Sequence, residues 1–271
     1  MSDASRGPIS RAAMLRPLVT KTWHETRSRF LIGVVAVAGL SLVLLFWQGT
    51  LRTQFSARLP AAAVETAVAA LTYGEYIHRF LYAGAVQPLG QLIALVLAMG
   101  GLQRERETGT TSLTLSLPVS RRELMGVRAA VGIIQVSAIA LVPAILIPAV
   151  SPLVAESYPV SQALGFWVLW VVAHTTIFSA ALLVSTIVPS QLTALMVTWL
   201  LLLAHSAVAL LPALQPFRLN LGRIATGVGM PYFDSTTSLL IGLPWPRLAV
   251  MALLSVGLMA AASRVTERQD Y

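Results

Sequence analysis

The chain contains no cysteine, a single lysine and few charged residues of either sign. Without cysteine, a disulfide framework and a thiolate metal site are both excluded. The four histidines are far apart, and no pair has the spacing of metal ligands. His24-Glu25 begins like the HExxH motif of zinc proteases, but position 28 is serine, so that motif is absent. No GxSxG sequence occurs, which removes the usual signature of a nucleophile elbow.

A phosphate-binding loop of the Walker A type is absent as well. Such a loop needs Gly-Lys-Ser/Thr, and the only lysine, Lys21, follows Thr20. No acidic residue lies at mid-membrane depth in the apolar runs described below, which argues against a carrier driven by protons or sodium. We therefore expect this chain not to be an enzyme and to bind no metal or cofactor of its own.

Long apolar runs dominate the sequence instead. Of its 271 residues 56% are hydrophobic and 11% are charged, and the mean hydropathy is +0.75. A soluble domain has about 25% charged residues. Runs of about 18 residues or more can cross a hydrocarbon core of about 30 Å as helices. The sequence thus predicts an all-α polytopic membrane protein of one transmembrane domain, residues 1–271, with six spans at about 30–48, 80–102, 129–150, 164–188, 191–212 and 247–263. Pro189 separates the fourth span from the fifth.

The distribution of basic residues predicts the orientation. With the N-terminus inside, thirteen basic residues lie on the cytoplasmic side and six on the other. Because cytoplasmic loops are enriched in Lys and Arg, both termini are expected in the cytoplasm. The net charge of +8 is explained by this topology, so no nucleic acid partner is expected. The polar start of the chain argues against a cleaved signal peptide.

Two segments outside the spans have their own patterns. Residues 11–29 alternate apolar and basic positions at helical spacing, which predicts an amphipathic helix in the inner headgroup layer, in contact with membrane lipids. A disordered basic tail is the alternative. Residues 213–246 form a long extracytoplasmic segment with four prolines. Its apolar patch, Ser238 to Leu243, is too short to span and suits an interfacial or re-entrant piece.

Residues 103–128 form a charged cytoplasmic loop between the second and third spans. The charges of Gln103-Arg-Glu-Arg-Glu107 mark the exit from the hydrocarbon. Gly109 then interrupts the helix, and a short helix from Thr111 to Leu117 ends before Pro118. Ser120-Arg-Arg-Glu123 matches a capping box that would start the third span. The loop therefore contains a short helix with defined ends.

This loop resembles the cytoplasmic loop of ABC type-2 export permeases, the membrane subunits of ATP-binding-cassette exporters. The resemblance rests on Glu-x-x-Gly-Thr, a short Leu-rich helix and Pro-x-Ser-Arg, and it covers about 25 residues. In that family the short helix of this loop is the coupling helix, which docks on an ATPase subunit. The resemblance therefore implies that the short helix here and its flanks contact an ATPase subunit. The residues concerned are Glu105, Glu107, Gly109, Thr110, Thr111, Leu113, Leu115, Leu117, Pro118, Ser120 and Arg121. Ser112, Thr114 and Arg128 stand where family members often have an acidic residue and a lysine, so the polarity of docking is expected to differ.

The resemblance also implies the partners. ATP and Mg would be bound by a separate ATPase subunit, and a second permease subunit would complete a homodimer or pseudo-dimer. The implied function is ATP-driven export by a multi-pass protein of the cytoplasmic (inner) membrane of a bacterium. The alternatives are an ATP-independent scaffold or receptor that anchors a cytoplasmic partner, an intramembrane enzyme, for which no catalytic group is found, and an ordinary charged loop between spans.

Polar residues inside the spans are candidates for a translocation path. We single out Gln91, Gln135, His174 and His205. The competing interpretation is that these side chains form hydrogen bonds between helices and hold the bundle together.

Overall fold

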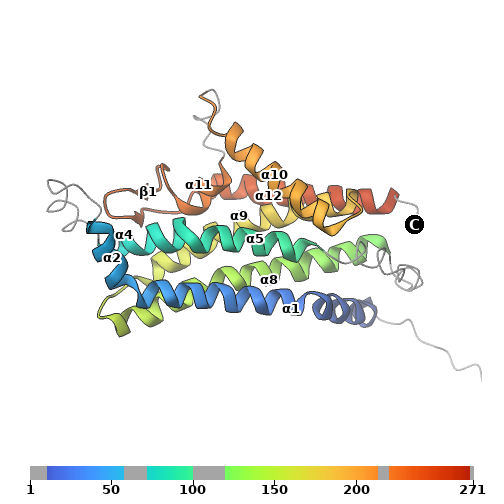
Figure 1. Ribbon diagram of the computed structural model, residues 1–271. Coiled ribbons are helices and arrows are strands. Elements are labelled where there is room, and N and C mark those ends of the chain that lie inside the picture. The colour runs from blue at the N-terminus through green and yellow to red at the C-terminus, as the bar shows by residue number, and fades with distance from the viewer. Residues whose placement is uncertain (1–10, 58–71, 100–119, 213–219, 269–271) are drawn as a thin grey trace, which may run out of the picture.

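The computed structural model describes residues 11–57, 72–99, 120–212 and 220–268. Within these residues six helices are long and apolar enough to cross a membrane, which confirms the predicted all-α fold class (Figure 1). Their elements are α1 (Arg11–Phe46), α4 (Tyr73–Tyr76) with η1 (Ile77–Ala85) and α5 (Val86–Ala98), α8 (Arg121–Val150), α9 (Val160–Ile187), α10 (Gln191–Val208) and α12 (Trp245–Arg268). Shorter elements are α2 (Gln48–Ala57), η2 (Ser151–Val154), α11 (Leu221–Thr226), β1 (Phe233–Asp234) and β2 (Leu239–Leu240).

The helices pack around α9. It contacts α5, α8, α10, α11 and α12, and 61% of the residues in its most apolar 18-residue stretch are buried. For α10 that share is 11%, and Figure 1 shows this helix leaning away from the others. The core contains a group of buried aromatic rings in which Tyr82 stacks on Phe166 and meets Trp170 edge-on. The bundle therefore has a well-packed centre and one helix that is mostly exposed.

Close helix contacts occur where the sequence has glycine. A Cβ atom at Gly132 in α8 would lie 2.1 Å from the ring of Phe178 in α9. At Gly90 in α5 it would lie 2.9 Å from the imidazole of His174, also in α9. Small residues let neighbouring helices approach closely in membranes, where van der Waals packing replaces the hydrophobic effect. These two glycines bring α5 and α8 against the central helix.

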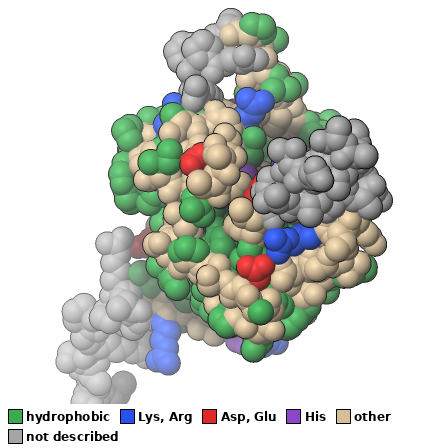
Figure 2. Space-filling view, turned by 90° about the vertical axis from the view of Figure 1, so that its left-hand side faces the viewer, with side chains coloured by type: hydrophobic (Ala, Val, Ile, Leu, Met, Phe, Trp, Pro, Cys, Tyr) green, Lys and Arg blue, Asp and Glu red, His purple; other side chains and the backbone are tan. Residues whose placement is uncertain are grey.

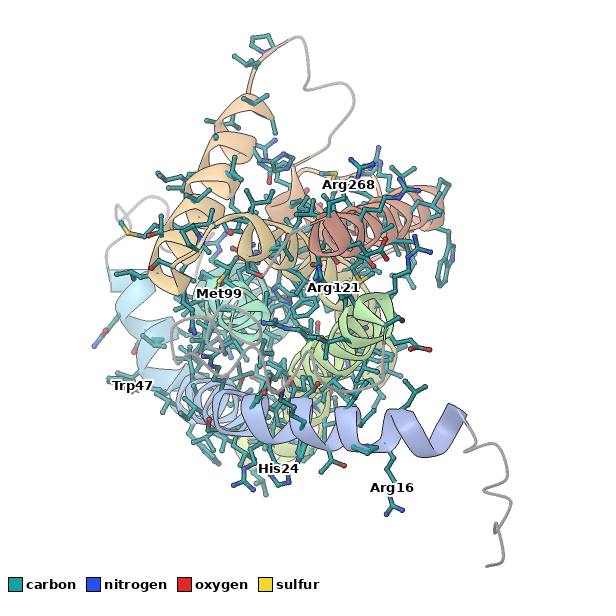
Figure 3. The ribbon with its side chains drawn as sticks, turned by 90° about the vertical axis from the view of Figure 1, so that its right-hand side faces the viewer. Arg16, His24, Trp47, Met99, Arg121 and Arg268 are labelled. Atoms are coloured by element: carbon teal, nitrogen blue, oxygen red, sulfur yellow. The ribbon has the colours of Figure 1, made fainter. Side chains whose placement is uncertain are left out.

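The first helix is longer than a membrane crossing requires. It has 36 residues, about 54 Å at a rise of about 1.5 Å per residue, whereas a span needs about 20 residues. Figure 3 shows that its first part, which carries Arg16 and His24, runs across the end of the bundle before the helix turns along the bundle. The predicted segment 11–29 is thus helical and continuous with the first span.

The second span contains a π-helix, η1, between the α-helical segments α4 and α5. Gly84 within it has non-helical angles, with φ −93° and ψ −128°. Pro88 lies four residues later, and a proline ring inside a helix collides with the carbonyl four residues earlier. A Cβ atom at position 84 would lie 2.7 Å from the carbonyl oxygen of Arg79, so glycine fits this kink.

Residues 233–240 form a short hairpin at the end of the bundle opposite the start of α1 and the end of α12 (Figure 1). Here the structure has a β-hairpin, with Leu239 and Leu240 in its second strand, where the sequence suggested an interfacial or re-entrant piece. Gln162 in the first turn of α9 holds this strand, because its side chain donates to the Leu240 carbonyl at 3.0 Å and accepts from the Leu240 N–H at 2.8 Å. The hairpin is therefore attached to the central helix.

Candidate functional site: the helix ends that flank residues 100–119

The predicted coupling helix is flanked by two helix ends that the structure describes. Its expected contact residues Glu105, Glu107, Gly109, Thr110, Thr111, Leu113, Leu115, Leu117 and Pro118 lie outside the described residues. The chain enters this segment after α5, which ends at Ala98, and leaves it at Ser120, directly before α8. We call these the entry flank and the exit flank.

Two arginines hold the entry flank. Arg29 of α1 donates to the carbonyls of Val96, at 3.2 Å, and of Met99, and Arg128 of α8 donates to the Ala98 carbonyl at 3.1 Å. The last carbonyls of a helix have no partner within the helix and carry the negative end of its dipole. A guanidinium satisfies both needs, so the end of α5 is fixed between α1 and α8.

Arg29 also reaches a third helix. Its guanidinium donates to the side-chain oxygen of Gln191, at 3.3 Å, in the first turn of α10. Arginine presents several N–H groups in a rigid fork, so one side chain can bind several acceptors at once. Through Arg29 the entry flank is linked to α10, the most loosely packed of the six helices.

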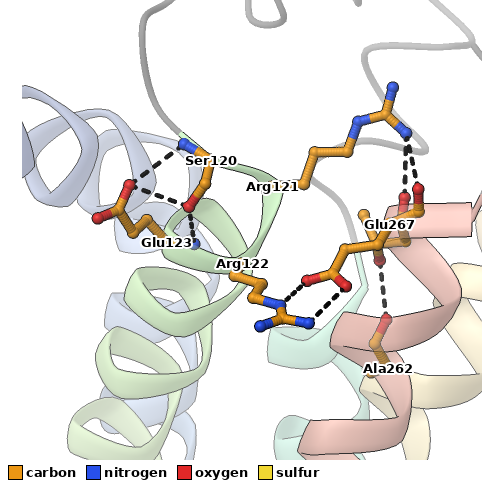
Figure 4. A network of polar contacts seen from close by, with 7 residues as sticks. Ser120, Arg121, Arg122, Glu123, Ala262 and Glu267 are labelled. Atoms are coloured by element: carbon orange, nitrogen blue, oxygen red, sulfur yellow. Dashed lines mark hydrogen bonds and ion pairs between the residues drawn. The ribbon is translucent and has the colours of Figure 1, made fainter.

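The exit flank begins with the predicted capping box, which the structure confirms (Figure 4). The Ser120 hydroxyl accepts from the Glu123 N–H at 3.2 Å, and the Glu123 carboxylate accepts from the Ser120 N–H at 3.2 Å and from its hydroxyl at 3.0 Å. A capping box satisfies backbone donors at a helix start that would otherwise lack partners. The start of α8 is therefore well defined directly after the segment.

The next two residues tie this start to the end of α12 (Figure 4). Arg121 donates to the carbonyls of Thr266, at 3.3 Å, and Glu267, at 3.5 Å, in the last turn of that helix. Arg122 forms an ion pair with the Glu267 carboxylate, with one of its bonds at 3.0 Å. The Arg122 side chain is 73% exposed, and exposed pairs contribute little to stability. Arg121 is thus the more direct link, since it caps a helix end.

The predicted path residues lie on four different helices, α5, α8, α9 and α10. Gln135 is buried and donates to the Thr26 hydroxyl at 2.7 Å, which joins α8 to α1. His174 is buried against Gly90, as described above, and Gln91 is half-buried on α5. His205 lines a cavity between α9, α10, α11 and α12. Of the four, His205 alone lines that cavity, and Gln135 has the hydrogen bond between helices that the competing interpretation describes.

Sequence reasoning found part of this site. The capping box of Ser120 and Glu123 is predicted from their spacing and is present, whereas the predicted contact of Ser120 and Arg121 with an ATPase subunit stays a prediction. The interhelical roles of Arg29, Arg128 and Glu267 were missed, because the sequence analysis used the arginines as evidence for orientation and, at Arg128, for the polarity of docking. Their positions carried a usable signal. Each arginine directly precedes an apolar run, on the same side of the predicted membrane as residues 103–128.

The helices and the two flanks define a multi-pass helical membrane protein in which one loop is held at both of its ends. A comparison with known families matches residues 22–221, more than half of the chain, to the ABC-2 family transporter proteins. The chain belongs to this family, and it is therefore a permease, the membrane subunit of an ABC transporter, in a system whose ATPase is a partner subunit. Searches of curated proteins and of solved structures find no match.

Proposed function

We propose that this permease is an exporter subunit in the cytoplasmic (inner) membrane of a bacterium, and that a separate ATPase subunit, which binds ATP and Mg, drives it through residues 110–117. The observation that carries the proposal is the attachment of both flanks. The entry flank is bonded to α1 and α8, and through Arg29 of α1 it is linked to α10, whereas the exit flank is bonded to α12. A displacement of the segment would therefore reach five helices through a few rigid contacts.

The orientation follows from the same end of the bundle. Arg16, Arg121 and Arg268 all lie at the end that faces the viewer in Figure 3, together with the start of α1 and the end of α12. We place this end in the cytoplasm because basic residues concentrate on that side of membranes. The first part of α1, which runs across this end, would lie in the headgroup layer and contact lipid.

A second permease subunit fits the exposed side of α10. Leu192, Met196, Leu200 and Leu203 recur at helical spacing and are between 53% and 66% exposed. Residues three or four apart share one face of a helix. We propose that a second copy, or a related permease, covers this face in the assembled transporter, so that movement of α10 changes the interface between the two subunits.

The first prediction tests the coupling segment. Replacing residues 110–117 by a Gly/Ser stretch of equal length should abolish the ATP-dependent change in the first turns of α8, because the ATPase then has no rigid element to move. The measurement is hydrogen–deuterium exchange of residues 120–135 in the purified permease–ATPase complex, with and without a non-hydrolysable ATP analogue.

Glu75→Gln provides the control, since Glu75 pairs with Arg79 at the opposite end of the bundle and its loss should leave the response intact. An unchanged response in the Gly/Ser variant would contradict the proposal. If the wild-type permease binds the ATPase and its exchange is the same with and without the analogue, the chain is a scaffold instead.

A further inference from the structure

A cavity of about 450 Å³ lies between α9, α10, α11 and α12. It exists because α10 leans away from the bundle, and its size falls within the range of about 300–1,000 Å³ that is common for small-molecule sites. The walls are mostly aliphatic, and they include Ile177, Leu201, Leu202, Val250, Leu254 and Leu258. The exposed fractions of Leu201, Val250 and Leu254 exceed one half, so the cavity is accessible from the surrounding hydrocarbon.

The polar groups of this cavity include one that can bind an anion, Arg247 in the first turn of α12. His205, near the end of α10, instead accepts a hydrogen bond from the Leu221 N–H at 3.4 Å. The Arg247 guanidinium donates to the sulfur of Met230 at 3.6 Å, and a thioether is a weak acceptor. Among the described residues no carboxylate forms a salt bridge with Arg247. Its remaining N–H groups are therefore suited to a strong acceptor from outside the chain.

The depth of the cavity matches one leaflet of a bilayer. From Arg247 to Leu258, α12 rises about 16 Å, which is roughly half of a hydrocarbon core of about 30 Å. Trp245 precedes Arg247 by two residues and is 64% exposed, and exposed tryptophans at helix ends mark the headgroup level of membranes. Arg247 thus lies at the headgroups, and the apolar walls extend towards the midplane.

We infer that this cavity is a binding site for one anionic phospholipid, whose phosphate contacts Arg247 and whose acyl chain lies between α10 and α12. A guanidinium binds phosphate oxygens in a fork of two hydrogen bonds, which favours a phosphate over a neutral headgroup. The lipid fills the space beside α10 and thereby sets the distance of α10 from α12. With the orientation proposed above, this lipid would lie in the outer leaflet, and the binding itself does not depend on that orientation.

The test is native mass spectrometry of the detergent-purified permease after incubation with phosphatidylglycerol or with phosphatidylcholine of the same chain length. The wild-type protein should retain one phosphatidylglycerol per chain in preference to phosphatidylcholine. Arg247→Gln should reduce that retention about tenfold, since a charge-assisted bond to phosphate is lost. Ala180→Phe, which places a ring in the cavity, should reduce retention of both lipids.

Arg223→Gln is the matched control, because Arg223 lies on α11 at the same end of the bundle, is exposed and does not line the cavity. Thermal unfolding of each variant shows whether it is folded. If Ala180→Phe is not folded, the retention measured for Arg247→Gln decides the test. Equal retention by the wild type and Arg247→Gln would overturn the inference. Equal retention of the two lipids, or displacement of the lipid by free inorganic phosphate, would also overturn it. A lipid-free wild-type dimer would overturn it too, because a second copy would then fill the cavity.

Discussion

Arginine side chains hold the two ends of the bundle in different ways. At the end with the hairpin, Arg52 pairs with Glu156 and Arg79 pairs with Glu75, each at 2.9 Å. Figure 2 looks onto this end and shows basic and acidic side chains close together, among hydrophobic side chains. At the end with the start of α1 and the end of α12, Arg29, Arg121 and Arg128 bind main-chain carbonyls at helix ends, and Arg122 pairs with Glu267. The two arginines of the hairpin end thus pair with carboxylates, whereas three of the four named at the other end bind helix termini.

This difference indicates which end of the permease stays fixed during transport and which end moves. The hairpin end also has buried hydrogen bonds between neutral groups, such as Tyr73 with Ser151 and His78 with the Thr226 carbonyl, each at 2.7 Å. Buried bonds of this kind are costly to break, because the separated groups have no water to bind. A bond from an arginine to a carbonyl near the surface can be exchanged for water at a lower cost. We therefore expect the hairpin end to act as the fixed point of the bundle.

The largest effect on stability is expected from Gln162→Leu at the hairpin end. This change removes both hydrogen bonds to Leu240 and leaves its N–H and carbonyl without those partners, so the free energy of unfolding should fall by about 2–4 kcal/mol. Thermal unfolding in detergent measures the change. Ser161→Ala, at the exposed neighbouring residue, should unfold like the wild type. Equal stability of Gln162→Leu and the wild type would show that the hairpin does not anchor α9.

A smaller loss of stability, about 1–2 kcal/mol, is expected from Arg29→Gln at the opposite end, because its part-buried, charge-assisted bonds to carbonyls are lost. Its effect on coupling should be larger. Hydrogen exchange in the first turn of α10 should no longer respond to the ATP analogue, since the link to Gln191 is lost. Arg27→Gln, at an exposed position in the same helix, is the control. A normal response of α10 in Arg29→Gln would remove Arg29 from the coupling route.

The smallest effect concerns pH and the hairpin turn. The Thr236 N–H and the Thr237 hydroxyl donate to Asp234, each at 2.8 Å, and hold the pKa of this carboxyl below its ordinary value. A lowered pKa in the folded state contributes stability above the ordinary value of about 4, and this contribution is lost as the pH falls through the folded value. Hydrogen exchange of residues 233–240, measured after pulses at different pH and corrected for the intrinsic rate, should therefore show opening only below about pH 4.

Asp234→Asn should show no such acid-induced opening, because an amide does not titrate in this range. If the wild type and the variant open alike in acid, the hydrogen bonds of Asp234 do not stabilise the turn.

The sequence predicted what depends on neighbouring residues and missed what depends on distant ones. The apolar runs and Pro189 give the six helices, and the spacing of Ser120 and Glu123 gives the cap of α8, because these are local properties. The three named partners of Arg29 are 67, 70 and 162 residues away in the chain, and such contacts leave no periodic pattern. The hairpin at 233–240 was missed for a related reason, since the apolar residues of β2 are held by Gln162 of another element.

The first part of α1 has a practical consequence for spectroscopy. Lys21 lies there, and it is the only lysine in a chain that has no cysteine. A single cysteine introduced next to Ser120 would therefore be the only thiol for one fluorophore, while Lys21 is the only side-chain amine for a second. Energy transfer between the two dyes would follow the distance from the first part of α1 to the exit flank during an ATP cycle, without prior removal of native cysteines.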